Sequence, residues 1–134
     1  MFPYRLAQAT VTSTFVLLIA GGLVHATESG LACPDWPTCY GSLMPEMKGG
    51  ILIEHGHRLI ATFVGILTIG LAVSIHITRR GERRLVRMGW AALALVIGQG
   101  ILGGVTVLLR LPTLVSSTHL ATAMIYFALI ITLT

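Results

Sequence analysis

The sequence predicts an all-α membrane protein in which four transmembrane helices form one bundle. Of its 134 residues, 54% are hydrophobic and 10% are charged, whereas a soluble domain carries about a quarter charged residues. The mean hydropathy is +0.86. Four apolar runs reach the roughly 20 residues that a helix needs to cross hydrocarbon. This length favours a single domain over residues 1–134.

The predicted spans follow one another with one long and two short connections. They cover residues 7–24, 51–78, 88–109 and 114–134, and the long loop covers residues 25–50. The first span lacks a small-residue cleavage site before its end, so we interpret it as a retained helix and not a removable signal peptide. The second span is polar in its first two turns and apolar from Leu59. Short connections between antiparallel helices are typical of a bundle.

Charge predicts the orientation of these spans. The segment TRRGERRLVR between the second and third spans is rich in arginine, which places it in the cytoplasm by the positive-inside rule. The 25–50 loop carries more acids than lysines and falls outside, and Arg110 is the one dissenting charge. We therefore expect both termini in the cytoplasm, and the loop on the periplasmic or extracellular side of an inner (cytoplasmic) membrane. The net charge of +4 reflects this topology, so we expect lipid and not nucleic acid as a partner.

Two histidines lie near the starts of different spans. His57 lies roughly 10 Å and His119 roughly 8 Å below the start of its helix, at 1.5 Å per residue. Both helices run inward, so the two imidazoles are predicted at matched depth. Polar groups inside a span are usually functional, and bundles hold heme between facing helices. We predict that His57 and His119 are the axial ligands of a heme iron. The alternative is that each is satisfied by a backbone carbonyl or a threonine hydroxyl.

Two charged residues flank the first of these histidines. Glu54 lies one helical turn before His57, where a carboxylate can transfer protons, orient the histidine or hold a substrate. The alternative is an acid in the first turn, stabilised by the helix N-terminus. Arg58 can pair with a heme propionate or extend to lipid headgroups. His55 points away from the His57 face and is expected at the membrane interface.

A weak internal repeat relates the two halves of the chain. The first and third spans each end with a glycine pair, Gly21–Gly22 and Gly103–Gly104, and the second and fourth begin with His57 and His119. Two related hairpins would explain this pattern. The glycines serve either close helix packing or the approach of a flat ring to the backbone.

The outer loop contains the two cysteines, Cys33 and Cys39. Outside the cytoplasm such a neighbouring pair tends to be oxidised, either as a structural disulfide or as a redox-active pair. Zinc is less favoured, because the spacing is unusual and no further ligands flank the pair in the sequence. Trp36 and Tyr40 suit a loop that dips to the membrane interface.

Three segments together resemble the heme A synthase family. They are SGLACPDWPTCYG in the loop, EHGHR at residues 54–58 and STHLATA around His119. The resemblance implies a membrane oxidoreductase that converts the C8 methyl of heme O to the formyl of heme A for cytochrome oxidase biogenesis. It further implies that His57 and His119 ligate one heme, that Glu54 is the catalytic acid, and that Cys33 and Cys39 form a disulfide.

The chain departs from the family in its number of helices. Typical members have eight helices in two halves, each with a histidine pair, and one pair is usually assigned to a heme b. This chain corresponds to one half. It is either a compact four-helix form, which we expect to self-associate into a homo-oligomer, or a fragment of a longer protein, or a protein that binds heme without the full oxidation. A heme O synthase and an electron donor are further expected partners. The alternatives are a small bis-histidine cytochrome b that carries heme or electrons, and a heme-free assembly subunit.

Overall fold

The computed structural model describes residues 2–134 and contains four helices connected by loops. The helices are α1 (Phe2–Ala26), α2 (Gly49–Thr78), α3 (Arg83–Leu108) and α4 (Thr113–Ile131). Each is long and apolar enough to cross a membrane, which confirms the predicted all-α, multi-pass architecture. The first and third helices begin earlier than their apolar runs. At α3 the reason is that arginine is a good helix former, so the helix continues beyond its apolar part.

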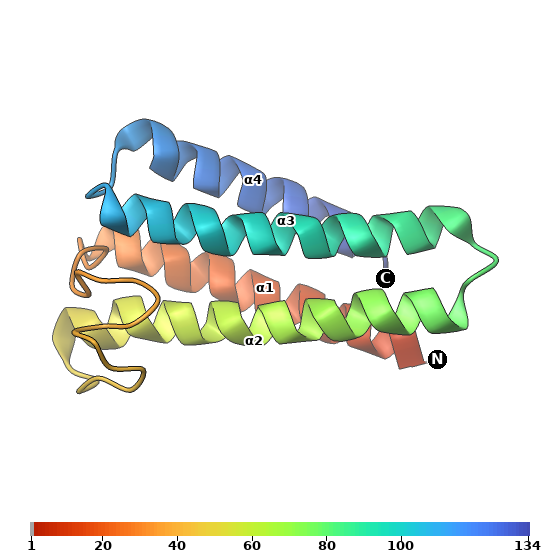
Figure 1. Ribbon diagram of the computed structural model, residues 1–134, viewed down its shortest axis with the longest axis horizontal. Coiled ribbons are helices and arrows are strands. Elements are labelled where there is room, and N and C mark those ends of the chain that lie inside the picture. Colours follow the sequence, from red (N-terminus) through yellow and green to blue (C-terminus); the bar gives the residue numbers. More distant parts are fainter. Residues whose placement is uncertain (1) are drawn as a thin grey trace.

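The helices form a ring of neighbours. Contacts join α1 to α2, α2 to α3, α3 to α4 and α4 back to α1. Helices α2 and α4 therefore face each other across one diagonal of the bundle, and α1 and α3 across the other. Figure 1 shows both termini and the turn between α2 and α3 at or towards one end, with the long loop and the connection between α3 and α4 at the other. Which end faces the cytoplasm remains a prediction from charge.

The apolar core occupies the part of the bundle away from the long loop. One cluster contains Val64, Ala92, Tyr126 and Ile130, and a second is built around Leu71. The buried residues of α4 are Tyr126 and Ile130, both in its second half. The first half of α4 leans away from α3, as both ribbon views show. His119 thus lies on the loosely packed part of its helix.

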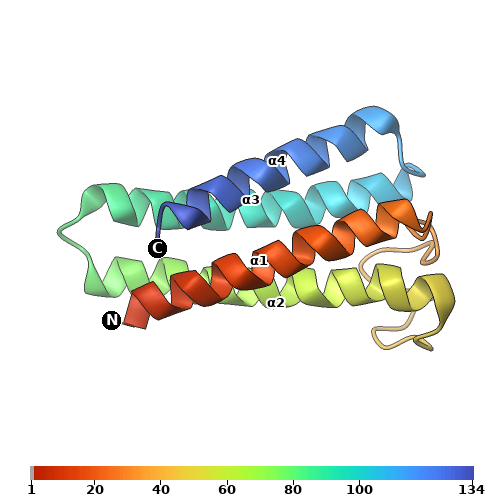
Figure 2. The ribbon, with the colours of Figure 1, turned by 180° about the vertical axis from the view of Figure 1, so that it is seen from behind.

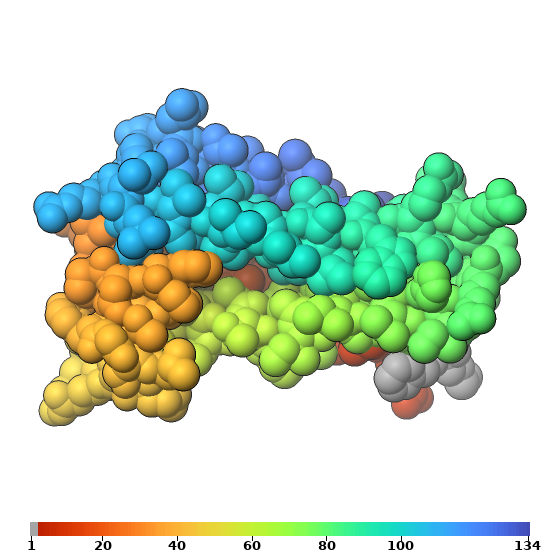
Figure 3. Space-filling model, viewed as in Figure 1, coloured from red at the N-terminus to blue at the C-terminus, as the bar shows by residue number. Residues whose placement is uncertain are grey.

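The long loop crosses the end of the bundle from α2 towards α3. Its surface fills the space between these helices at that end (Figure 3). The indole of Trp36 lies directly against Gly104 of α3, where an added Cβ would meet the ring carbon Cδ2 at 2.7 Å. Only glycine leaves room for this contact. The loop is therefore attached to a helix far from it in the sequence, and Trp36 serves packing as well as any contact with the membrane surface.

Candidate functional site

The two predicted ligands lie on diagonally opposed helices. His57 is on α2 and His119 on α4, both at the loop end of the bundle and both half-buried. Hairpin topology explains this arrangement, since α2 and α4 each start at the same end. A flat group held between the two rings would lie inside the ring of four helices.

Each imidazole rests on a glycine of the preceding helix. A Cβ added at Gly21 would lie 3.1 Å from Cε1 of His57, and one added at Gly103 would lie 3.5 Å from Cε1 of His119. A Cβ at Gly22 would meet nothing within 4 Å. The flat rings that approach the backbone at Gly21 and Gly103 are therefore those of the histidines themselves. The internal repeat corresponds to one glycine–histidine contact made once in each hairpin.

The surroundings of the two rings differ in their polar partners. Nδ1 of His57 is buried and has no hydrogen-bond partner. Nδ1 of His119 lies 3.1 Å from the side-chain amide of Gln99 on α3. Sequence reasoning missed Gln99, although a polar residue inside an apolar span was a signal that could have identified it.

These residues fit the axial ligation of a heme. Two neutral imidazoles are a common donor set for heme iron. Burial of the unpartnered Nδ1 of His57 is costly. Binding of a ligand by either nitrogen of this ring would account for that cost. The glycines at positions 21 and 103 let both rings lie deep against the bundle wall. His57 and His119 would thus hold the iron, and a bound heme would supply the redox chemistry.

Glu54 and Arg58 hold the long loop against α2. The Glu54 carboxylate is 3% exposed; its Oε2 accepts a hydrogen bond of 2.7 Å from the Cys33 N–H, and its Oε1 lies 2.5 Å from Arg58. Arg58 Nη1 donates to the carbonyls of Asp35 (2.8 Å) and Thr38 (2.7 Å), and Nη2 also donates to that of Cys33 (3.3 Å). Charged pairs with this many additional hydrogen bonds are strongly oriented.

Two sequence-based alternatives for this pair are wrong. Helix α2 begins at Gly49 and has no acid in its first turn, so Glu54 is not an N-terminal dipole partner. The Arg58 side chain is 13% exposed and contacts loop carbonyls, so it does not extend to lipid headgroups. Its four terminal N–H groups are all engaged, which leaves only Nε–H for a heme propionate. The role of Arg58 that the contacts favour is anchoring of the loop.

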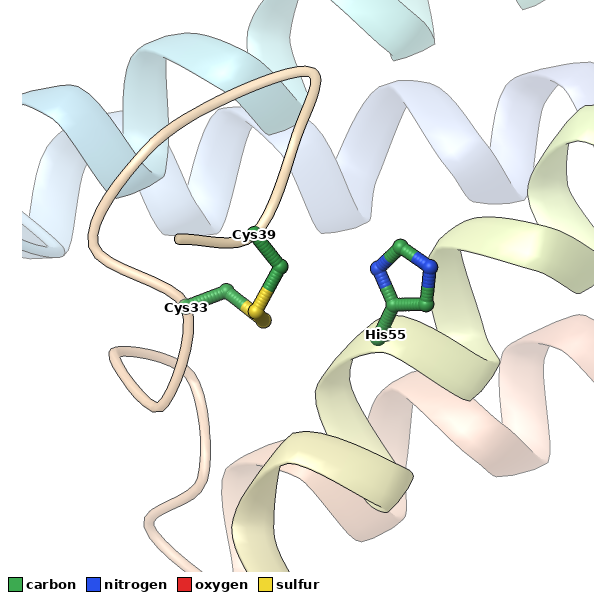
Figure 4. A group of neighbouring side chains, drawn as sticks. All are labelled: Cys33, Cys39 and His55. Carbon is green, nitrogen blue, oxygen red and sulfur yellow. A yellow bond between two sulfur atoms is a disulfide. The ribbon is translucent and has the colours of Figure 1, made fainter. Parts of the chain in front are cut away.

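The loop is closed by a disulfide between Cys33 and Cys39, as predicted. Both cysteines are fully buried, which favours a structural role. Figure 4 shows His55 beside them, with one ring nitrogen turned towards the sulfurs. Its Nε2 donates to the Leu43 carbonyl at 3.0 Å, and its Nδ1 has no partner.

The expectation of an interfacial His55 is wrong. The side chain is 3% exposed, because the loop folds back over the start of α2 and covers it. The two sulfurs and one nitrogen of His55 lie within 4.8 Å of one another. Sulfurs bonded to each other offer no thiolate, so this cluster is a packed pair and not an open metal site.

Asp35 organises the turn inside the disulfide loop. Its carboxylate accepts hydrogen bonds from the backbone N–H groups of Tyr40 (2.6 Å) and Gly41 (2.9 Å) and from the Thr38 hydroxyl. The bond from Thr38, followed by that from Gly41, lowers the pKa of Asp35 from 3.8 to about 2. The loop conformation therefore depends on an ionised Asp35.

Comparison with known proteins identifies the family. The family model COX15-CtaA, described as a cytochrome oxidase assembly protein, matches residues 4–51 and 46–134. The chain belongs to this family. It is similar to proteins named heme A synthase from Bacillus pumilus (36% identical) and Lysinibacillus sphaericus (33%), over 97% and 95% of its length. A heme A synthase from Symbiobacterium thermophilum is 32% identical over 95% of the chain.

The chain spans less than half of the length of those relatives. It spans 44% of the proteins from Bacillus pumilus and Symbiobacterium thermophilum and 42% of the one from Lysinibacillus sphaericus. The predicted resemblance is thus confirmed, and so is the expectation that the chain corresponds to about half of a typical member.

Proposed function

We propose that this chain acts as a heme A synthase unit that oxidises the C8 methyl of heme O to the formyl of heme A during cytochrome oxidase assembly. The observation that carries the proposal is the pair of glycine-backed imidazoles on diagonally opposed helices, beneath a loop anchored one turn from His57. Family membership and the names of the relatives support it.

The oxidation requires partners that supply an oxygen atom and remove electrons. Conversion of a methyl to a formyl group with water as the oxygen source releases four electrons and four protons by stoichiometry. An external electron acceptor, and a heme O synthase that delivers the substrate, are the partners we propose. Heme O is the substrate and heme A the product, and a heme b can occupy the same histidine pair.

The roles of the side chains follow from their positions. His57 and His119 would hold the iron of a bound heme, which would supply the redox chemistry between α2 and α4. Glu54, one turn before His57, takes up a proton released at the reacting methyl. Arg58 acts as a positioning residue, since it fixes the Glu54 carboxylate and the loop that covers it.

Mass spectrometry of the heme that co-purifies from cells making heme O tests the proposal. We expect hydroxylated or formyl-bearing heme with the wild-type chain. The Glu54→Ala variant should retain heme but yield no oxidised product. Glu46→Ala is the matched control, because Glu46 is an exposed acid paired with Lys48. Oxidised heme from the Glu54 variant at the wild-type level would remove the proposed role of this residue.

The second candidate function is a bis-histidine cytochrome b. It is favoured by the two diagonally opposed imidazoles of His57 and His119, which suffice to ligate one heme. Heme b alone, with no oxidised product, would support this function and contradict the first. Replacement of His57 or His119 by alanine should abolish the low-spin optical spectrum in either case. Absence of heme from the wild-type chain would leave the assembly-subunit alternative.

We also propose that copies of the chain associate and that the loop lies outside the inner membrane. A second copy would supply the helices that the other half supplies in longer relatives. Native mass spectrometry of the detergent-extracted protein should show a defined oligomer, and a strictly monomeric active species would contradict this. A reporter enzyme that works only in the cytoplasm should be active when it is fused after residue 134, and one that works only outside the cytoplasm should be inactive there.

A further inference from the structure

The two hairpins place the same glycine–histidine contact in different polar surroundings. The residue one helical turn before Gly21 is Leu17, and the residue one turn before Gly103 is Gln99. Both side chains are partly buried on the helix that backs a histidine. The repeat therefore offers an amide to one imidazole and has an aliphatic side chain at the matching position of the other hairpin.

Gln99 contacts the turn of α4 that carries His119 at several points. One end of its amide lies 3.1 Å from Nδ1 and 3.1 Å from the carbonyl oxygen of His119. The other end contacts the Thr122 hydroxyl and lies 3.2 Å from the Ala123 nitrogen. A single side chain of α3 thus fixes both the ring and the backbone at this position of α4.

The amide can serve either tautomer of His119. It can present its nitrogen to an unprotonated Nδ1 or its oxygen to an Nδ1–H. When Nε2 of a histidine binds a metal, Nδ1 carries the proton and usually donates to an oxygen, which orients the ring and raises its basicity. Gln99 can supply that oxygen after rotation of its terminal amide, which exchanges the bond to the His119 carbonyl for one from Nδ1–H.

His57 has no comparable side-chain partner. Its Nδ1 is buried and unpartnered, and the Leu17 side chain offers no hydrogen-bonding atom. The ring packs against Gly21 on that side. Its orientation as a ligand is therefore less constrained than that of His119.

We propose that Gln99 is a positioning residue that makes His119 the firmly held axial ligand, while His57 is the exchangeable one. The heme part of this inference rests on the proposed function. A site that accepts one heme and releases another benefits from one ligand that detaches first. The asymmetry arises from the difference between Gln99 and Leu17 at matching positions of the repeat.

Nitrogen NMR of 15N-histidine-labelled, heme-free protein tests the contact itself. Gln99→Leu should shift the Nδ1 resonance of His119 and leave that of His57 in place. Leu17→Gln should do the reverse, and Leu17→Met is the control for packing at that position. An unchanged His119 resonance in Gln99→Leu would overturn the proposal, whether or not the protein binds heme.

Heme transfer to apomyoglobin tests the consequence for ligation. Loss of a partner of this kind typically lowers metal affinity 10–100-fold, so we expect heme b to leave Gln99→Leu about 10–100 times faster than wild type. Gln99→Glu should restore retention and raise the iron–histidine stretching frequency in the photolysed carbon monoxide complex, which a purely structural role would not do.

The same complex identifies the exchangeable ligand. Carbon monoxide should displace His57, so the remaining iron–histidine stretch responds to Gln99 variants and not to Leu17→Gln. A response to Leu17→Gln alone, or heme loss from Gln99→Leu within twofold of wild type, would overturn the assignment. A wild-type chain that binds no heme would refute the proposed function, while the NMR result would still decide the contact.

Discussion

Replacement of Arg58 by methionine should release the disulfide loop from the bundle. The side chain makes three bonds to loop carbonyls and one to the Glu54 carboxylate, at 13% exposure. Methionine keeps most of the apolar stem but leaves the buried Glu54 charge without its cation. Breaking a buried pair in this way costs about 3–5 kcal/mol. At 1.4 kcal/mol per factor of ten, the equilibrium constant for loop opening should rise by roughly two to three and a half orders of magnitude.

Hydrogen exchange in lipid nanodiscs measures this opening. The Cys33 amide is the best reporter, because it donates to Glu54 in the closed loop. The matched control is Arg79→Met, since the Arg79–Glu82 pair is about half exposed on both sides (52% and 50%) and such a pair contributes about 0–1 kcal/mol. The double variant Glu54→Gln with Arg58→Met removes the stranded charge and should recover part of the protection. Exchange in Arg58→Met within threefold of wild type would refute the reasoning.

Three further predictions concern the glycine, the loop turn and the core. Gly21→Ala places a Cβ 3.1 Å from the His57 ring, so it should displace the imidazole and cost about 1–3 kcal/mol by overpacking. Gly22→Ala meets nothing within 4 Å and should change stability by less than about 0.5 kcal/mol. Equal thermal unfolding of the two variants would contradict the contact. The pKa of Asp35 is lowered from 3.8 to about 2, so its stabilisation of the loop should be complete above pH 3.8 and lost as pH falls towards about 2. Loop exchange in Asp35→Asn should lack this pH dependence, and an unaltered profile would exclude the group. Tyr126→Phe removes the 2.5 Å hydrogen bond to Thr68 and should lower the free energy of unfolding in detergent by about 0.6 kcal/mol. A loss above about 3 kcal/mol would contradict this single-bond account and indicate a larger hydrogen-bond network.

The amino-acid sequence by itself determined the number, kind and order of the helices. A bilayer accepts only segments that satisfy their own backbone hydrogen bonds, so long apolar runs leave few alternatives to helices. The loop motif with Cys33 and Cys39 and the EHGHR segment also sufficed to identify the family, which the comparisons confirm. Helix period placed Glu54 and His57 on one face, because that relation is local.

Tertiary structure alone decided how the loop and the helices use these side chains. Arg58 contacts carbonyls 23 and 20 residues away along the chain, and Trp36 packs on Gly104. His55 is buried under the long loop, although its position in the sequence favoured the membrane interface. Gln99 meets His119 only because α3 and α4 pack side by side. Such contacts depend on how elements fold back on one another, and a pattern read along the chain carries only the period of each element. The sequence therefore specified which side chains enter the bundle, and the packing of distant segments decided which of them meet.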